Sequence, residues 1–363
     1  MINKKRNWIN MNIPSVGIDV GEQYSVVTYI SPNGDIIDHF EFEMNENGFT
    51  EFNKRIPYNV SIAFEASGLA YVVTKKLKSL GYSNITVAHP KNLAWITKSK
   101  HKNDHVDSIK LAKLNLVGMI PESHLLDDEE RIFRDLLIQR VKLGQEIGSV
   151  KNAIISYLKR EGVFNNLPET EDNFSKKRRE EMKKIRFDNE KDLVLQSMFE
   201  RLELYESQAK IFENKIKERA RENENVKLLM TIRGVDYYLA SLLMSYIQNI
   251  NRFENEGKLA SFFGIVPSNR DSSSITQRGR MSKEGASTAR WALSIAVTTV
   301  MRYNEPISKY YHYEKERKKS GKKAYVLTMR KLLRMIYHML KTGKDWKYEI
   351  ESLTELKWMN LNE

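Results

Sequence analysis

The order of strand-like and helix-like segments up to about Val117 restricts the fold more than any other feature of this sequence. Three segments rich in β-branched and aromatic residues come first, separated by turn-forming residues such as Pro32-Asn33-Gly34-Asp35. In chain order we expect strands at Val16–Val20, Tyr24–Ile30 and Ile36–Phe42, a helix at Asn47–Ile56, a strand at Val60–Phe64, a helix at Leu69–Leu80 and a strand at Ile85–Ala88. An antiparallel meander followed by β–α–β units predicts a mixed sheet with helices, not a doubly wound parallel sheet.

The rest of the chain is expected to be helical. Apolar residues recur at helical spacing from Ile132 to Leu158 and again from Leu195 to Ile216, with a polar segment at Asn165–Ser175 between them. This pattern predicts two long amphipathic helices, forming an antiparallel hairpin or a dimerising coiled coil, or serving only as a rigid spacer. A basic helical region follows, interrupted by glycine-containing turns. The expected parts are residues 1–125 (mixed sheet with helices), 126–225 (helical hairpin), 226–345 (helical domain) and a tail at 346–363.

The charge balance favours a polyanionic partner. Lys and Arg total 59 against 47 Asp and Glu, which gives a net charge of +12, and nucleic acid is the commonest partner of such a surface. The chain has no cysteine, which excludes disulfides and thiolate metal sites and agrees with a cytoplasmic location. No apolar run is long enough to span a bilayer, and the N-terminus lacks the apolar segment of a secretory signal.

Four acidic residues stand at positions where such a fold could bring them together. Asp19 lies in the first expected strand and Glu65 at the end of the fourth, while Asp104 and Asp107 project from one helix face. Carboxylates confined in one site cannot all stay ionised without a cation, so this set predicts Mg²⁺, with two ions about 3.5–4 Å apart. Taken singly, each residue has an ordinary interpretation as a turn former or a helix cap.

A serine-rich segment, Gly264–Gly285, is expected to be a polar loop. It places Ser272, Ser273 and Ser274 among basic residues, and a serine hydroxyl in that environment can attack a phosphodiester because the cations stabilise charge on the phosphoryl oxygens. The alternative interpretation is a flexible loop that only contacts phosphate. The basic residues concerned are Arg270, Arg278, Arg280, Lys283 and Arg290.

Two further basic segments are expected to contact nucleic acid. Lys98, Lys100 and Lys102 precede Asp104 closely, so they are well placed to hold a strand near the acidic residues. Between Lys309 and Lys323, basic residues that include Lys318 and Lys322 alternate with tyrosines that could stack on unpaired bases. A solvated helix face with tyrosines in the core explains the second segment equally well. The histidines show no metal-ligand spacing.

Taken together, these motifs resemble those of one family, the transposases of insertion-sequence family 110, which are related to the Piv-type DNA invertases. Both ends of the chain carry the resemblance, in the family's order. The motifs are Gly17-Ile18-Asp19-Val20, Phe64-Glu65-Ala66-Ser67-Gly68, Lys102-Asn103-Asp104-His105-Val106-Asp107-Ser108, Gly264-Ile265-Val266-Pro267, and Gly279-Arg280-Met281-Ser282-Lys283-Glu284-Gly285 with Arg290.

The resemblance implies an RNase H or RuvC-like N-terminal domain in which Asp19, Glu65, Asp104 and Asp107 bind Mg²⁺. It also implies a C-terminal transposase domain whose nucleophilic serine falls on Ser272 and forms a covalent bond to DNA. Ser273 stands where the family usually has glycine, which leaves the assignment between these two serines open. The family further implies a structured guide RNA, composite sites shared between subunits, and a homo-oligomer (a dimer, and a tetramer in the active complex).

The resemblance also points to a helix-hairpin-helix-like turn that grips phosphate through backbone N–H groups. Here Arg233 replaces the usual proline, Gly234 remains, and Asp236 occupies the second glycine position. The expected function is therefore DNA transposition or site-specific recombination. The alternatives are a Piv-like invertase without an RNA guide, a RuvC-like nuclease or resolvase that uses a metal-bound water, and a binding protein descended from such an enzyme.

Overall fold

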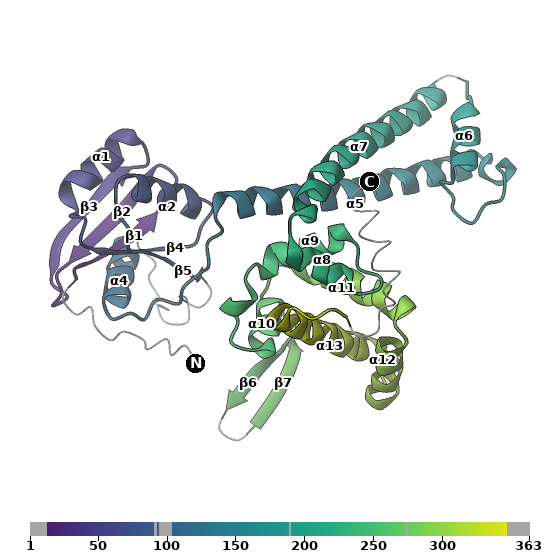
Figure 1. Cartoon of the computed structure of the whole chain (residues 1–363). Helices are drawn as coiled ribbons and strands as arrows, with labels where there is room; N and C mark the ends of the chain where they lie inside the picture. Colours follow the sequence, from purple (N-terminus) through teal and green to yellow (C-terminus); the bar gives the residue numbers. More distant parts are fainter. Residues whose placement is uncertain (1–12, 91–92, 94–103, 189, 273–274, 347–363) are drawn as a thin grey trace. The chain divides into compact units, whose positions relative to one another are not determined.

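The structure is a computed structural model of the 363-residue chain, and it describes residues 13–90, 93, 104–188, 190–272 and 275–346. The chain divides into two compact units, Met1–Asp127 and Asp128–Glu363, and each is described by itself (Figure 1). Of the described helices, none is both long and apolar enough to cross a membrane.

A five-stranded mixed sheet forms the centre of the first unit, with the strand order β3-β2-β1-β4-β5. The strands are β1 (Ser15–Val20), β2 (Tyr24–Ile30), β3 (Ile36–Glu43), β4 (Ser61–Glu65) and β5 (Ile85–Ala88). Strands β1, β2 and β3 pair antiparallel, whereas β4 is parallel to both β1 and β5. This topology confirms the predicted mixed sheet, with the meander first and the β–α–β units after it.

Helices cover both faces of this sheet: α1 (Glu46–Arg55) and α2 (Ala70–Ser79) lie on one side, and α4 (Asp104–Leu116) lies on the other (Figure 1). Alternation along the strands explains the division. The buried side chains of Val16 and Ile18 belong to the same core as those of α1 and α2, whereas Gly17 and Ser15 contact α4.

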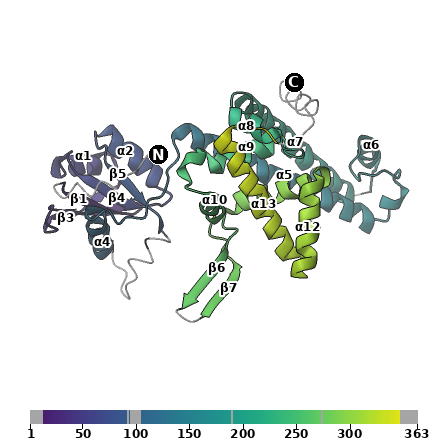
Figure 2. The ribbon, with the colours of Figure 1, turned by 60° about the horizontal axis from the view of Figure 1, so that its bottom comes forward.

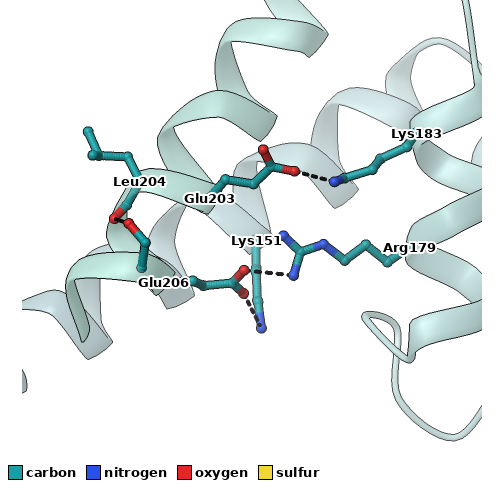
Figure 3. Close-up of polar contacts among 7 residues, drawn as sticks. Lys151, Arg179, Lys183, Glu203, Leu204 and Glu206 are labelled. Atoms are coloured by element: carbon teal, nitrogen blue, oxygen red, sulfur yellow. Dashed lines mark hydrogen bonds and ion pairs between the residues drawn. The ribbon is translucent and has the colours of Figure 1, made fainter. Parts of the chain in front are cut away.

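A long helical hairpin begins the second unit, as the apolar spacing predicted. Helices α5 (Asp128–Arg160) and α7 (Glu190–Arg221) pack along each other. The polar segment Asn165–Ser175 between them is without helix or strand apart from the end of the 3₁₀ turn η1 (Phe164–Asn166), and a further helix, α6 (Lys176–Lys184), follows it. The sequence shows no apolar period in this helix, because Met182 is its only apolar residue. That side chain is fully buried in a hydrophobic core with residues of α5 and α7. Ion pairs add to the attachment: Glu206 of α7 pairs with Arg179 at 2.7 Å and with Lys151 of α5 at 3.5 Å (Figure 3).

The remaining helices enclose one large hydrophobic core. They are α8 (Glu224–Met230), α9 (Tyr237–Ile247), η2 (Ile250–Arg252), α10 (Glu256–Phe262), α11 (Ser287–Tyr303), α12 (Glu305–Lys318) and α13 (Gly321–Thr342). The described part of this core includes side chains of α5 and α7, such as Leu137 and Ile216, so the hairpin and the helical domain share packed residues.

One expectation for this unit was wrong. The serine-rich segment is not a loop but an antiparallel hairpin of β6 (Pro267–Ser272) and β7 (Ile275–Met281). Figure 2 shows it extending away from the helices. The sequence signal was weak because a two-stranded ribbon that projects from its domain need not bury either face, so it lacks the alternation that marks a strand over a core. Pairing of the two backbones still satisfies the hydrogen-bonding groups on their facing edges.

Candidate functional site

Two of the expected acidic residues lie at neighbouring strand ends. Strands β1 and β4 run parallel with Ile18 opposite Phe64, so the next residues, Asp19 and Glu65, occupy adjacent positions. Laterally adjacent residues on parallel strands project to the same face of the sheet. Asp19 is half-buried and Glu65 is exposed. The carboxyl ends of these strands therefore present two carboxylates side by side.

Gly17 determines how closely α4 approaches that face. A Cβ atom at Gly17 would lie 2.1 Å from the carbonyl oxygen of Ser108 and 2.4 Å from the backbone nitrogen of Ala112. No side chain fits between β1 and α4 at this position, so only glycine permits the contact. The helix backbone therefore lies directly on the strand that carries Asp19.

The contacts along β1 also give the direction of the helix. The Ser15 hydroxyl donates to the Ala112 carbonyl at 2.9 Å, and Gly17, one step further along the strand face, lies against both Ser108 and Ala112. Residues earlier in α4 therefore lie nearer the carboxyl end of β1. The first turn of α4, which carries Asp104 and Asp107, is consequently at the same edge of the sheet as Asp19.

A chain of polar contacts fastens this first turn to the sheet. The Thr28 hydroxyl lies 2.7 Å from the Ser108 hydroxyl and 2.8 Å from Nδ1 of His39. His39 Nε2 is 2.7 Å from Nδ1 of His105, whose Nε2 lies 3.3 Å from a carboxylate oxygen of Glu41. No motif indicates these contacts beforehand, because the two histidines are far apart in the sequence. Only the pairing of β2 with β3 and the docking of α4 bring them together.

The acidic residues suit a hard divalent cation by their chemistry. All their donor atoms are carboxylate oxygens, which Mg²⁺ prefers. Their side chains do not form a closed ligand set: among the described residues, no three His, Asp or Glu side chains are grouped closely enough to hold a metal ion. Asp107 instead accepts a hydrogen bond from Lys110 at 3.0 Å. Lys98, Lys100 and Lys102 lie outside the described residues.

Ser272 is the last residue of β6 and pairs with Ile275 of β7. Ser273 and Ser274 lie outside the described residues, and so do the side chains of residues 268–280, which include Arg270, Arg278 and Arg280. The backbone places all three arginines on the two hairpin strands.

Close backbone packing supports the base of this hairpin. A Cβ atom at Gly264 would lie 2.7 Å from the backbone nitrogen of Glu284, and one at Gly285 would lie 2.0 Å from the carbonyl oxygen of Phe262. The Lys283 N–H donates to the Gly264 carbonyl at 3.0 Å, and the Arg290 guanidinium donates to the Gly285 carbonyl. The hairpin therefore emerges from a tightly held base.

The turn between α8 and α9 has the expected compact form. Gly234 adopts φ +97°, and a Cβ atom there would lie 2.9 Å from the backbone of Thr299, so this glycine is required both for its conformation and for space. Asp236 caps α9 by accepting a hydrogen bond from the Leu239 N–H at 2.8 Å. Arg233 is exposed and its guanidinium lies 5.5 Å from the centre of the Tyr303 ring. Its phosphate contact stays a prediction.

The remaining expected basic residues are exposed near the ends of two helices. Lys318 is the last residue of α12, and Lys322 lies in the first turn of α13. The tyrosines of this segment do not share one environment, because Tyr313 is largely exposed whereas Tyr311 is half-buried. Exposure leaves Tyr313 accessible, and the contact of this segment with nucleic acid stays a prediction.

Comparison with protein families finds two matching segments. Residues 16–162 match a family described as "Transposase", whose model is that of the DEDD transposases of IS110, and this range contains all four acidic residues. Residues 226–312 match the "Transposase IS116/IS110/IS902 family", and this range contains the Arg233–Gly234 turn and the serine hairpin.

Two curated proteins are similar over much of their length. The transposase for insertion sequence element IS1533 of Leptospira borgpetersenii is 27% identical over 252 residues, which is 66% of this chain and 71% of that protein. The putative transposase y4qE of Sinorhizobium fredii is 24% identical over 341 residues, which is 90% of this chain and 81% of that protein.

Proposed function

Since the chain belongs to the IS110 family of transposases and is a DNA recombination enzyme, we propose that it cuts and rejoins DNA through a covalent serine–DNA intermediate at a divalent-metal site. The observation that carries the proposal is the placement of Asp19, Glu65 and the first turn of α4 at one edge of the sheet. Grouped carboxylates beside a phosphate backbone weaken binding unless a cation joins them, so a purely DNA-binding protein gains nothing from them.

In this proposal Asp19, Glu65, Asp104 and Asp107 would hold the metal, as two ions in the family's manner, and their carboxylate oxygens are the donors that Mg²⁺ prefers. When bound, the cations offset the repulsion among the carboxylates and stabilise the charge on the scissile phosphate. The glycine contact at Gly17 and the polar chain from Glu41 to Ser108 keep the first turn of α4 in place while DNA binds.

The serine half of the reaction is assigned to Ser272. Its hydroxyl oxygen forms a bond to phosphorus as the bond from phosphorus to the sugar oxygen of the departing strand breaks, and the hydroxyl proton ends on that departing oxygen. In the second step a strand hydroxyl attacks the phosphorus of the serine–phosphate bond, which re-forms a DNA phosphodiester and releases the serine. As many phosphodiester bonds are made as are broken, so no external energy source is needed. Arg270, Arg278, Arg280, Lys283 and Arg290 contribute positive charge around the hairpin that binds the phosphate backbone.

The partners follow from the same proposal. The DNA is joined by a structured guide RNA from the same element, and Lys98, Lys100, Lys102, Arg233, Gly234, Lys318 and Lys322 contribute phosphate contacts. The net charge of +12 supports a nucleic-acid-rich complex. The chain acts as a homo-oligomer, a dimer that assembles into a tetramer, in which acids of one subunit and the serine of another form a composite site.

The covalent intermediate provides the direct test. The protein is incubated with end-labelled DNA from its own element and Mg²⁺, and the adduct is separated on a denaturing gel. Ser272→Ala is expected to abolish the adduct, while Ser273→Ala retains it; the reverse result moves the nucleophile by one residue. Asp19→Asn is expected to abolish cleavage with DNA binding retained. Cleavage that leaves free ends and no adduct in the unsubstituted protein would instead support a RuvC-like nuclease that uses water.

The guide RNA is tested separately. The protein is expressed together with its flanking genomic DNA and purified, and the co-purifying nucleic acid is sequenced. A single structured RNA encoded beside the gene is the expected result. Random cellular RNA, or none, would favour a Piv-like invertase that recognises DNA unaided, and it would leave the serine and metal assignments intact.

A further inference from the structure

A cavity of about 560 Å³ opens at the base of the serine hairpin, where β7 ends at Met281. Its other walls come from three helices that pack against one another, α11, α12 and α13. Its volume lies within the range of small-molecule sites. Neither the acidic edge of the first unit nor the hairpin strands account for it, so it is a separate feature of the second unit.

Aromatic side chains dominate the cavity: Trp291 of α11, Tyr311 of α12 and Tyr325 of α13 all line it. The hydroxyl of Tyr325 donates to the Ser294 carbonyl at 2.5 Å and lies 2.8 Å from the Thr298 hydroxyl, which holds its ring in place. Trp291, by contrast, is 37% exposed although it is a large apolar side chain. A held ring and an accessible indole form a surface on which a flat aromatic ligand can stack.

The charge of the cavity is positive. Arg290 and Lys322 line it, and no acidic side chain is among its described lining residues. Both cations belong to the first turns of their helices, α11 and α13, where the helix dipole adds further positive potential. Ala286, at the start of α11, supplies no side-chain cap for that helix's first N–H groups. Aromatic walls with cations at the rim match a nucleotide, whose base stacks and whose phosphates are anionic.

We propose that this cavity holds an unpaired nucleotide of the DNA strand undergoing exchange, with the base against Trp291 and the flanking phosphates on Arg290 and Lys322. The proposal rests on the proposed function in one respect. The bound strand is taken to be DNA because the hairpin that borders the cavity also carries the proposed nucleophile. From Met281 to the residue opposite Ser272, β7 spans roughly 20 Å at about 3.3 Å per residue. The nucleotide held is therefore a neighbour of the attacked phosphate and not the attacked nucleotide itself.

Such a site has a clear use in strand exchange. A strand that changes partners must leave its old complement before it pairs with a new one. A base removed from the stack and bound by aromatic side chains cannot re-form its original pair. Stacking is tolerant of base identity because every base has an aromatic face, so the cavity would act on any target sequence.

The test is a binding measurement on the full-length protein in EDTA, where no cleavage occurs. The probes are a labelled DNA duplex with one unpaired adenine, the fully paired duplex, and the duplex with an abasic site in place of the unpaired adenine. We expect the first probe to bind most tightly. Trp291→Ala should weaken its binding by roughly 5- to 150-fold, the range typical of one stacked base, and should leave the paired duplex nearly unaffected.

Matched variants separate this effect from a general loss of structure. Trp291→Phe keeps an aromatic face and should retain the preference for the unpaired adenine. Tyr58→Ala removes an aromatic ring that is 59% exposed in the first unit and does not line the cavity, and it should have no effect. A preference that survives in Trp291→Ala, or is lost equally in Tyr58→Ala, overturns the proposal.

A salt titration tests the phosphate contact. Lys322→Ala should reduce the slope of log Kd against log salt by about 0.7 for one phosphate contact on a single strand, and Lys315→Ala, an exposed lysine of α12 outside the cavity, should change it less. Equal slopes in the two variants overturn the assignment of phosphate to Lys322.

An RNA arm tests the identity of the strand. The probe with an unpaired nucleotide is also made as RNA, and tenfold tighter binding of the RNA form overturns the assignment to DNA. The binding test is independent of the adduct test. If no adduct forms but the preference for the unpaired base is intact, only the proposed function is contradicted. If the adduct forms but the protein shows no preference for the unpaired base, only this inference is contradicted.

Discussion

Replacing Gly17 by alanine tests how the acidic residues are brought together. The new Cβ atom would lie 2.1 Å from the Ser108 carbonyl oxygen and 2.4 Å from the Ala112 nitrogen, and both are backbone atoms that cannot rotate away. To reach ordinary van der Waals contact near 3.4 Å, α4 would have to move away from β1 by roughly 1 Å.

That displacement affects both stability and activity. Overpacking of this kind costs about 1–3 kcal/mol, and at the upper end the first unit should lose roughly 10 °C in Tm. Because the first turn of α4 carries Asp104 and Asp107, the same movement shifts two of the four proposed metal ligands. A misplacement of about 1 Å can reduce a catalytic rate about 100-fold, so cleavage should fall far more than the loss of folded protein explains.

The assay compares metal-dependent DNA cleavage with thermal unfolding followed by circular dichroism. Gly68→Ala is the matched control, because Gly68 lies in the same unit next to Glu65, and a Cβ atom there would meet no other atom within 4 Å. We expect Gly17→Ala to lose activity at temperatures where it is still folded, and Gly68→Ala to resemble the unsubstituted protein. The reasoning is refuted if Gly17→Ala cleaves DNA at the normal rate with an unchanged Tm.

Three further predictions test other parts of the fold. His39→Ala should raise the Mg²⁺ concentration for half-maximal cleavage about 10-fold or more, because it removes the link between β3 and the first turn of α4. His39→Gln should recover part of the loss, and an unchanged Mg²⁺ dependence in His39→Ala would contradict the prediction. Gly234→Ala should lower the free energy of unfolding by about 1–3 kcal/mol, since φ is +97° and the Thr299 backbone occupies the space, and chemical denaturation measures it. Burial raises the pKa of Tyr82 to about 12, and its hydroxyl donates to the Ile56 carbonyl. The raised pKa means that the unfolded chain loses the Tyr82 proton first, so this contribution to stability is complete below pH 10 and is lost between about pH 10 and pH 12. Between about pH 10 and pH 12 the Tm of Tyr82→Phe should therefore fall less steeply than that of the unsubstituted protein. Equal declines in the two proteins would contradict the raised pKa of Tyr82 as the cause.

Much of the fold follows from local patterns that the sequence displays directly. The short apolar run Val16–Val20, with Asp19 within it, predicts a strand, and β1 lies there. The helical spacing in α5 and α7 predicts a long hairpin in the same way. These predictions hold because the period of side-chain burial depends on backbone geometry, which each segment sets for itself.

The positions of Asp19 and Glu65 also follow from the sequence, since Asp19 is the second-last residue of one recognisable strand and Glu65 is the last residue of another. That the two strands are neighbours, with Ile18 opposite Phe64, is decided by the sheet as a whole. The charged helix α6 and the serine hairpin escaped prediction for a related reason. The helix contributes one apolar side chain, Met182, to a hydrophobic core and is otherwise charged, and backbone pairing forms the hairpin. Neither element therefore shows the repeated apolar period that marks a helix or strand packed on a core.

Only the tertiary structure shows why Gly17 must be glycine, how His39 meets His105, and that Trp291, Tyr311 and Tyr325 line one cavity. In each case the residues belong to different elements, and nothing in the spacing of either element encodes the contact. The sequence by itself determined which segments become strands and helices and which residue types are available for chemistry. The packing of those segments decided which side chains share a site, because close approach depends on the shapes of two surfaces together.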